Sequence, residues 1–205
     1  HPDVAIRNGV GLEGMEISYE KVRRALQKLR ADKSPRVDEL SPRLLVHVSE
    51  EICEPLVILF SRSMEEGCVP EDWRKANIVP IYKAGSRSKA ENYRPVSLTS
   101  QICKVFEGLI RDVIVGYLEE GNLLNMTQHG FRRGRSCLTN ILAFLEEVTE
   151  GLDRRDSIDV VFLDFAKAFD KVPHERLLRK VRGMGIKGKL LRWIADWLKE
   201  RWQKV

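Results

Sequence analysis

Residues 158–165 form a short apolar run, and Asp164 lies near its end. The run is rich in β-branched and aromatic residues, so it predicts one buried β-strand. A carboxylate in that position is costly to desolvate unless a cation or several hydrogen-bond donors meet it. A divalent metal ion would satisfy it, because carboxylate oxygens are preferred ligands of magnesium. The alternative is that Asp164 caps the following turn or pairs with Lys167.

Asp164 also belongs to the last of five motifs that follow one another along the chain. In one-letter code they are KSP at 33–35, PEDW at 70–73, IVPIYK at 78–83 continuing to NYRPVSL at 92–98, QHGFRRGRS at 128–136 and FLDFAKAFDKVPH at 162–174. In order and spacing they resemble the reverse transcriptases of LINE-type, non-LTR retrotransposons. The last one resembles the first palm motif of that family, and the resemblance runs from about residue 17 onward.

The resemblance implies roles for single residues. Asp164 matches the acid that binds the two catalytic magnesium ions of the complete enzyme. Phe169 matches the aromatic gate that crowds the sugar 2′ position and favours deoxynucleotides. Lys83 and Arg94 are similar to the fingers cations that grip the incoming triphosphate. Asp170 recurs in the family motif, but its physical role concerns the following turn more than a metal.

The fourth motif is similar to the fingers segment that lies along template and primer. The resemblance therefore implies nucleic-acid contacts by Gln128, Arg132, Arg133 and Arg135. It also implies an RNA template, a DNA primer and deoxynucleoside triphosphates as partners. These residue types suit nucleotide addition, in which two metal ions stabilise the attacking and leaving oxygens and the protein mainly positions groups and neutralises charge.

Local charge supports nucleic-acid binding more than the net charge does, because +5 is mild for 205 residues. Glycines at 130 and 134 predict a flexible loop around the three arginines of the fourth motif. Cations on such a loop can approach a phosphate backbone and release its counterions. Phe131 either stacks on a base or sugar there or anchors the loop in the core.

The chain departs from a working polymerase in one respect. The family places further metal-binding carboxylates on a later hairpin with paired aspartates, and the 205 residues contain no Asp-Asp pair. The chain begins with His1 rather than Met and stops about where the next palm motif would begin. We therefore expect both ends to be cut, with the remaining palm and thumb supplied by missing C-terminal sequence. Binding of magnesium by this chain alone is then doubtful.

Relatives usually read Gly-Pro-Asp-Gly where this chain has residues 36–39, Arg-Val-Asp-Glu. Loss of both glycines and the proline is expected to disturb a tight turn. The substitution indicates either sequence decay or a lineage with a different loop.

Composition is that of a soluble globular chain, with 43% hydrophobic and 32% charged residues. No apolar run approaches the roughly 20 residues needed to cross a bilayer, so we expect no membrane partner. The four cysteines are widely spaced and show no metal-ligand pattern. They are interpreted as reduced, mostly packed thiols of an intracellular protein, nuclear or cytoplasmic, with a zinc site as the alternative.

Helical periodicity predicts helices at about 18–30, 100–121, 136–152 and 190–198. It also predicts one helix that begins at residue 41, a longer one after it that ends at residue 67, and one that begins at residue 173. Residues 73–82 are expected to be extended, with Pro80 at an edge or bulge. Helices with few strands and no regular βαβ alternation predict an α+β fold. The resemblance sharpens this to a partial right-handed polymerase: residues 1–16 a linker or upstream remnant, 17–157 fingers-like, and 158–205 the truncated start of the palm. An incomplete palm is expected to aggregate or swap domains.

Three functional hypotheses follow. The first is a fragment of an RNA-directed DNA polymerase that adds deoxynucleotides to a primer by two-metal phosphoryl transfer, inactive as this isolated chain. The second is a non-catalytic nucleic-acid-binding remnant of a retrotransposon. The third is a decayed interaction scaffold without nucleic-acid contact.

Overall fold

The computed structural model describes residues 11–32, 36–165 and 168–205. Its elements in chain order are α1 (Tyr19–Gln27), α2 (Pro42–His47), α3 (Ser49–Glu66), the 3-10 helix η1 (Glu71–Arg74), β1 (Lys75–Tyr82), the 3-10 helix η2 (Ala90–Asn92), β2 (Tyr93–Thr99), α4 (Gln101–Glu120), α5 (Cys137–Asp153), α6 (His174–Gly183), α7 (Gly188–Trp197) and β3 (Trp202–Lys204). The KSP motif at 33–35, Lys167 and the first ten residues of the expected linker lie outside the described residues.

The predicted α+β class is confirmed, since helices dominate and one small sheet is present. Two compact units make up the chain, one combining the residues up to Tyr117 with Pro173–Val205 and the other comprising Leu118–Val172. The functional boundary expected near residue 157 stays a prediction. In the described ranges, no helix combines the length and apolar content that crossing a membrane requires.

The core of the first unit is aromatic. Phe60 of α3 and Phe106 of α4 stack with ring centroids 4.5 Å apart. Trp73 packs edge-on against both rings, and Trp193 of α7 meets Phe106 at 5.3 Å. All four side chains are almost completely buried. Rings in such edge-to-face and stacked pairs add to the free energy gained by burial, so they fix α3, α4 and α7 against one another.

The helices begin and end at the residues that capping rules single out. Ser18 accepts a hydrogen bond from the Lys21 backbone N–H at the start of α1, and Ser136 does the same for Thr139 at the start of α5. Gly67 ends α3 in the left-handed conformation, with φ of 66°. Local sequence therefore sets these boundaries, although α1 ends at Gln27, short of the expected residue 30.

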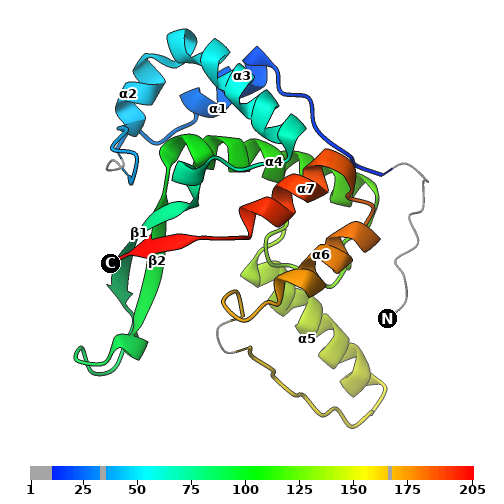
Figure 1. Cartoon of the computed structure of the whole chain (residues 1–205). Helices are drawn as coiled ribbons and strands as arrows, with labels where there is room; N and C mark the ends of the chain where they lie inside the picture. Colours follow the sequence, from blue (N-terminus) through cyan, green and yellow to red (C-terminus); the bar gives the residue numbers. More distant parts are fainter. Residues whose placement is uncertain (1–10, 33–35, 166–167) are drawn as a thin grey trace. The chain divides into compact units, whose positions relative to one another are not determined.

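The sheet has the strand order β2-β1-β3. β1 and β2 form an antiparallel hairpin in which Val79 faces Val96 and Pro80 faces Pro95; Figure 1 shows it extending away from the helices of its unit. β3 pairs in parallel with β1 only at Lys75–Asn77. The other side of β1 is therefore unpaired at Pro80 among the described residues, which fits the prediction that Pro80 sits at an edge.

Residues 11–16 belong to the expected linker, but they lie against the first unit. The Leu12 N–H donates to the Gly185 carbonyl at 2.9 Å, and the Lys187 N–H donates back to the Leu12 carbonyl at 2.9 Å. Leu12 and Met15 also pack on the edge of the core. This part of the segment thus contributes to the fold.

The second unit begins with the end of α4 and otherwise consists of α5 with irregular chain on either side of it. Residues 158–165, predicted to be a buried strand, are neither a strand nor buried. Ile158 instead lies so close to α5 that a Cβ at Gly151 would come within 2.6 Å of it. Phe162 contacts Phe144 of α5, with ring centroids 6.2 Å apart. The strand prediction is wrong for this structure because no described strand lies beside the segment to satisfy its backbone groups.

Candidate functional site

The two predicted triphosphate-binding cations lie on the β1–β2 hairpin of the first unit. Arg94 is the cross-strand partner of Ile81, and Lys83 continues the ladder two residues further, donating its backbone N–H to Asn92 at 2.8 Å. Because side chains alternate between the faces of a strand, Lys83 and Arg94 fall on the same face. Both are exposed. The register thus brings together two cations that are eleven positions apart in sequence.

Neither cation is neutralised within the part of the chain that the structure describes. No ion pair there joins Lys83 or Arg94 to a carboxylate. Lys89 at the hairpin tip differs, since its Nζ lies 3.9 Å from the Glu91 carboxylate. The free pair offers an anion one compact charge from lysine and one planar, bidentate fork from arginine.

Several contacts brace the tip of the hairpin. The Tyr93 hydroxyl donates to the Arg87 carbonyl at 2.9 Å, and the Asn92 amide donates to the Ser86 carbonyl at 2.8 Å. The Arg87 guanidinium lies 5.1 Å from the centre of the Tyr82 ring. These interactions hold residues 84–91 as an ordered loop and keep Lys83 at a defined place.

The base of the hairpin is fixed at two points. Asp38 accepts hydrogen bonds through Oδ2 from the Ser100 hydroxyl at 2.9 Å and from the Gln101 backbone N–H at 2.6 Å. These groups mark the exit of β2 and the start of α4. On the β1 side, Arg74 and Asp196 form a half-buried ion pair with a nitrogen–oxygen distance of 2.6 Å. The Arg74 guanidinium also donates to the carbonyls of Asp196 and Lys199.

Asp38 was not singled out from the sequence as a structural anchor. It is the only residue of the family's Gly-Pro-Asp-Gly pattern that this chain keeps, and that retention was the available signal. The turn itself is formed, with the Glu39 N–H donating to the Arg36 carbonyl at 2.9 Å. Glu39 adopts φ of 57°, at a position where the family resemblance implies glycine. The expected disturbance of the turn is therefore limited to backbone strain at one residue.

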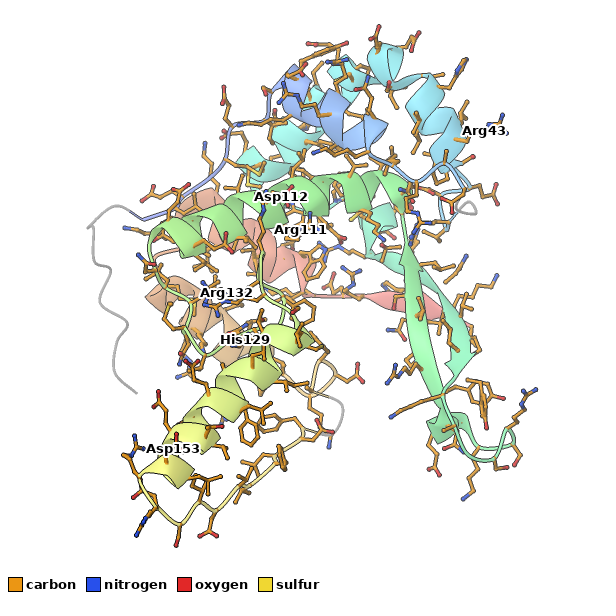
Figure 2. The ribbon with its side chains drawn as sticks, turned by 180° about the vertical axis from the view of Figure 1, so that it is seen from behind. Arg43, Arg111, Asp112, His129, Arg132 and Asp153 are labelled. Atoms are coloured by element: carbon orange, nitrogen blue, oxygen red, sulfur yellow. The ribbon has the colours of Figure 1, made fainter. Side chains whose placement is uncertain are left out.

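In the second unit, the basic loop before α5 is held by its own hydrogen bonds. Asn125 is the centre: its carbonyl accepts from the Gln128 N–H at 3.1 Å and from the Arg132 guanidinium at 3.0 Å. Its side-chain oxygen accepts from the Thr127 N–H at 3.0 Å. His129 Nδ1 lies 2.9 Å from the Thr139 hydroxyl of α5. Figure 2 labels His129 and Arg132 in this loop.

The side chains of the predicted nucleic-acid-binding residues of the loop differ in their hydrogen bonds and in their exposure to solvent. The Gln128 amide is turned onto its own loop and donates to the Gly130 carbonyl at 3.3 Å. Arg132 and Arg135 are half-buried, whereas Arg133 is exposed. Within the described ranges none of the three arginines forms an ion pair with a carboxylate. The loop is thus a positively charged surface with one fully available side chain.

The two aromatic residues singled out from the sequence meet in this unit. Phe131 is 89% exposed and Phe169 is 82% exposed. Their ring centroids lie 6.2 Å apart at an interplanar angle of 87°, an edge-to-face contact. Of the two readings of Phe131, the anchor buried in the core is excluded by its exposure.

Asp164 lies in the irregular segment and is exposed, as are Leu163 and Phe165 on either side. No described residue forms an ion pair or a side-chain hydrogen bond with Asp164. Neither alternative to metal binding is tested, because the turn that Asp164 would cap and the Lys167 that it would pair with both involve residues 166–167, which lie outside the described residues.

The described residues do not fit a complete magnesium centre. Such a centre needs several oxygen ligands around one point. No group of three or more His, Cys, Asp or Glu side chains gathers anywhere in the described ranges. Asp164 supplies one carboxylate, which alone does not make a magnesium centre.

Comparison with known proteins gives the family. Residues 81–205 match the model of the family described as reverse transcriptase (RNA-dependent DNA polymerase). The chain is similar to the probable RNA-directed DNA polymerase from transposon BS of Drosophila melanogaster, with 29% identity over 81% of this chain and 18% of that protein. It is also similar to the RNA-directed DNA polymerase from mobile element jockey of the same species, with 26% identity over 81% of this chain and 18% of the relative.

A third relative is the retrovirus-related Pol polyprotein from type-1 retrotransposable element R2 of Popillia japonica, 29% identical over 58% of this chain and 16% of its own length. The chain thus spans less than a fifth of the curated relatives it matches. The family match covers more than half of the chain and includes Lys83, Arg94 and Asp164. The chain therefore belongs to the reverse transcriptase family, among the polymerases of non-LTR retrotransposons.

Proposed function

We propose that this chain is the fingers and first palm segment of a right-handed RNA-directed DNA polymerase. The parent enzyme adds deoxynucleotides to a DNA primer on an RNA template. The observation that carries the proposal is the placement of Lys83 and Arg94 on one face of a braced hairpin, without carboxylate partners among the described residues. Two such cations suit the triphosphate of an incoming nucleotide, because phosphoryl transfer depends on positioning and charge neutralisation.

The remaining roles in the proposal follow the family resemblance. In the complete enzyme, Asp164 would supply one of the carboxylates for two magnesium ions, and Phe169 would restrict the sugar 2′ position. Gln128 and the basic loop contact template and primer. Because the segment around Asp164 is irregular and exposed, we propose that the isolated chain binds nucleic acid without extending a primer.

The hairpin proposal is tested by primer extension on an RNA template with the full polymerase that contains this chain. Lys83→Gln and Arg94→Gln each remove one phosphate contact and are expected to raise the KM for deoxynucleotides at least about tenfold, since hydrogen bonds to charged groups contribute roughly 1.5–3 kcal/mol. Lys89→Gln is the matched control, because Lys89 lies on the same hairpin but pairs with Glu91. Equal KM values in all three variants would refute the proposed role of the hairpin.

A further inference from the structure

We propose that Phe131, supported edge-on by Phe169, stacks on an unpaired base of single-stranded nucleic acid while the neighbouring arginines contact its backbone. The proposal rests on the nucleic-acid binding proposed above. It adds that the loop recognises bases as well as phosphates.

Exposure of the ring is the first observation. Phe131 leaves 89% of its surface open, and the edge-to-face contact with Phe169 covers only a small part of it. Exposing an apolar ring to water is unfavourable in free energy, so a partner that covers the ring would stabilise it. A nucleobase offers a flat partner, and stacking on an aromatic side chain is tolerant of sequence because every base has a π-face.

Backbone strain at the same residue is the second observation. Phe131 adopts φ of 58°, a left-handed conformation that is an outlier for a bulky side chain. Residues held in this way gather at ligand-contacting positions, where the surrounding structure over-determines them. Here the surrounding structure is the loop centred on Asn125, which holds the Arg132 guanidinium at 3.0 Å and the Gln128 N–H at 3.1 Å. The ring is therefore held outward by an ordered loop.

Charge identifies the class of ligand. Arg132, Arg133 and Arg135 lie within four positions of Phe131, and none pairs with a carboxylate among the described residues. A cationic loop with an exposed aromatic residue combines the two elements by which proteins bind single strands: electrostatic contact with the backbone and stacking on the bases.

The experiment measures fluorescence anisotropy of two labelled twelve-nucleotide oligomers with the 205-residue chain. One is oligo(dT), and the other has the same phosphates and sugars but no bases. Phe131→Leu is expected to weaken oligo(dT) binding about fivefold to 150-fold, because stacking contributes roughly 1–3 kcal/mol per base. It should leave binding of the baseless oligomer unchanged. Arg133→Gln should weaken the binding of both oligomers equally and reduce the salt dependence of that binding.

Two further variants separate binding from folding. Phe162→Leu is the matched control, since Phe162 is 85% exposed but pairs with Phe144 instead, and it should bind both oligomers normally. Phe131→Gly removes the ring and relieves the backbone strain, so it should lose oligo(dT) affinity while its melting temperature holds or rises.

The outcomes are distinguishable. Stacking is refuted if Phe131→Leu weakens the binding of both oligomers equally, or of neither. The proposed backbone contact still stands in that case if Arg133→Gln weakens the binding of both oligomers. If the wild-type chain binds neither oligomer, both the stacking and the nucleic-acid binding on which it rests are refuted.

Discussion

Replacing the half-buried Asp38 by alanine should destabilise the first unit much more than a substitution on its exposed surface does. Asp38 Oδ2 accepts from the Gln101 N–H at 2.6 Å and the Ser100 hydroxyl at 2.9 Å, and Oδ1 accepts from the Leu40 N–H at 3.3 Å. Ser100 and Gln101 are only 3% and 4% exposed, so water cannot replace the carboxylate. The negative charge also faces the N-terminus of α4, where it is favourable.

The typical energies of these hydrogen bonds indicate a large loss in the free energy of unfolding. A hydrogen bond to a charged group contributes about 1.5–3 kcal/mol, and a favourable charge at a helix N-terminus about 0.3–1 kcal/mol. Because contributions that share one side chain are not additive, we expect a loss of about 3 kcal/mol in the free energy of unfolding. Asp38→Asn keeps one carbonyl acceptor and should lose about half as much, roughly 1.5 kcal/mol.

Urea unfolding followed by circular dichroism measures these losses. Asp112→Ala is the control, because Asp112 lies on the exposed face of α4, paired with Arg111 (Figure 2). An exposed pair of this kind is worth little, so the control should change stability by less than about 0.5 kcal/mol. A loss for Asp38→Ala no larger than that of the control would refute the anchoring role.

Three further predictions concern the turn, the thiols and the surface of α5. Glu39→Gly should raise the free energy of unfolding by about 0.5–1 kcal/mol by urea titration, because glycine adopts the left-handed conformation without strain; a loss of stability would contradict this. Burial raises the pKa of the Cys53 and Cys103 thiols, so a thiol reagent should label only the other two cysteines of the native chain at neutral pH, whereas fast labelling of all four would contradict the packing. Leu142 is 55% exposed on α5, and Leu142→Glu should reduce self-association of the isolated chain in sedimentation equilibrium; an unchanged monomer fraction would exclude this face.

Helix positions could be predicted because their signals are local. Ser18, Ser136 and Gly67 act through neighbouring backbone groups, and the structure places them as helix caps. The four cysteines were expected to be mostly packed. All are free thiols, but only Cys53 and Cys103 are buried.

Features that depend on distant partners were harder to predict. Residues 158–165 have the composition of a buried strand but no partner strand among the described residues, so they stay irregular. β2 and the three-residue β3 were not predicted, because pairing with β1 defines them. In the candidate site, Lys83, Arg94 and Phe131 could be identified from the sequence. That the two cations lie on the same face of the β1–β2 hairpin could not, because the strand register decides it.

We propose that Asp164 serves nucleotide addition in the parent polymerase. Primer extension on an RNA template with Asp164→Asn tests it most directly, beside Asp159→Asn, which changes another exposed aspartate of the same irregular segment. We expect Asp164→Asn to abolish extension, because the neutral amide lacks the charge of the carboxylate that the family resemblance assigns to this position, while Asp159→Asn retains extension. Extension at the wild-type rate by both variants would refute this role of Asp164.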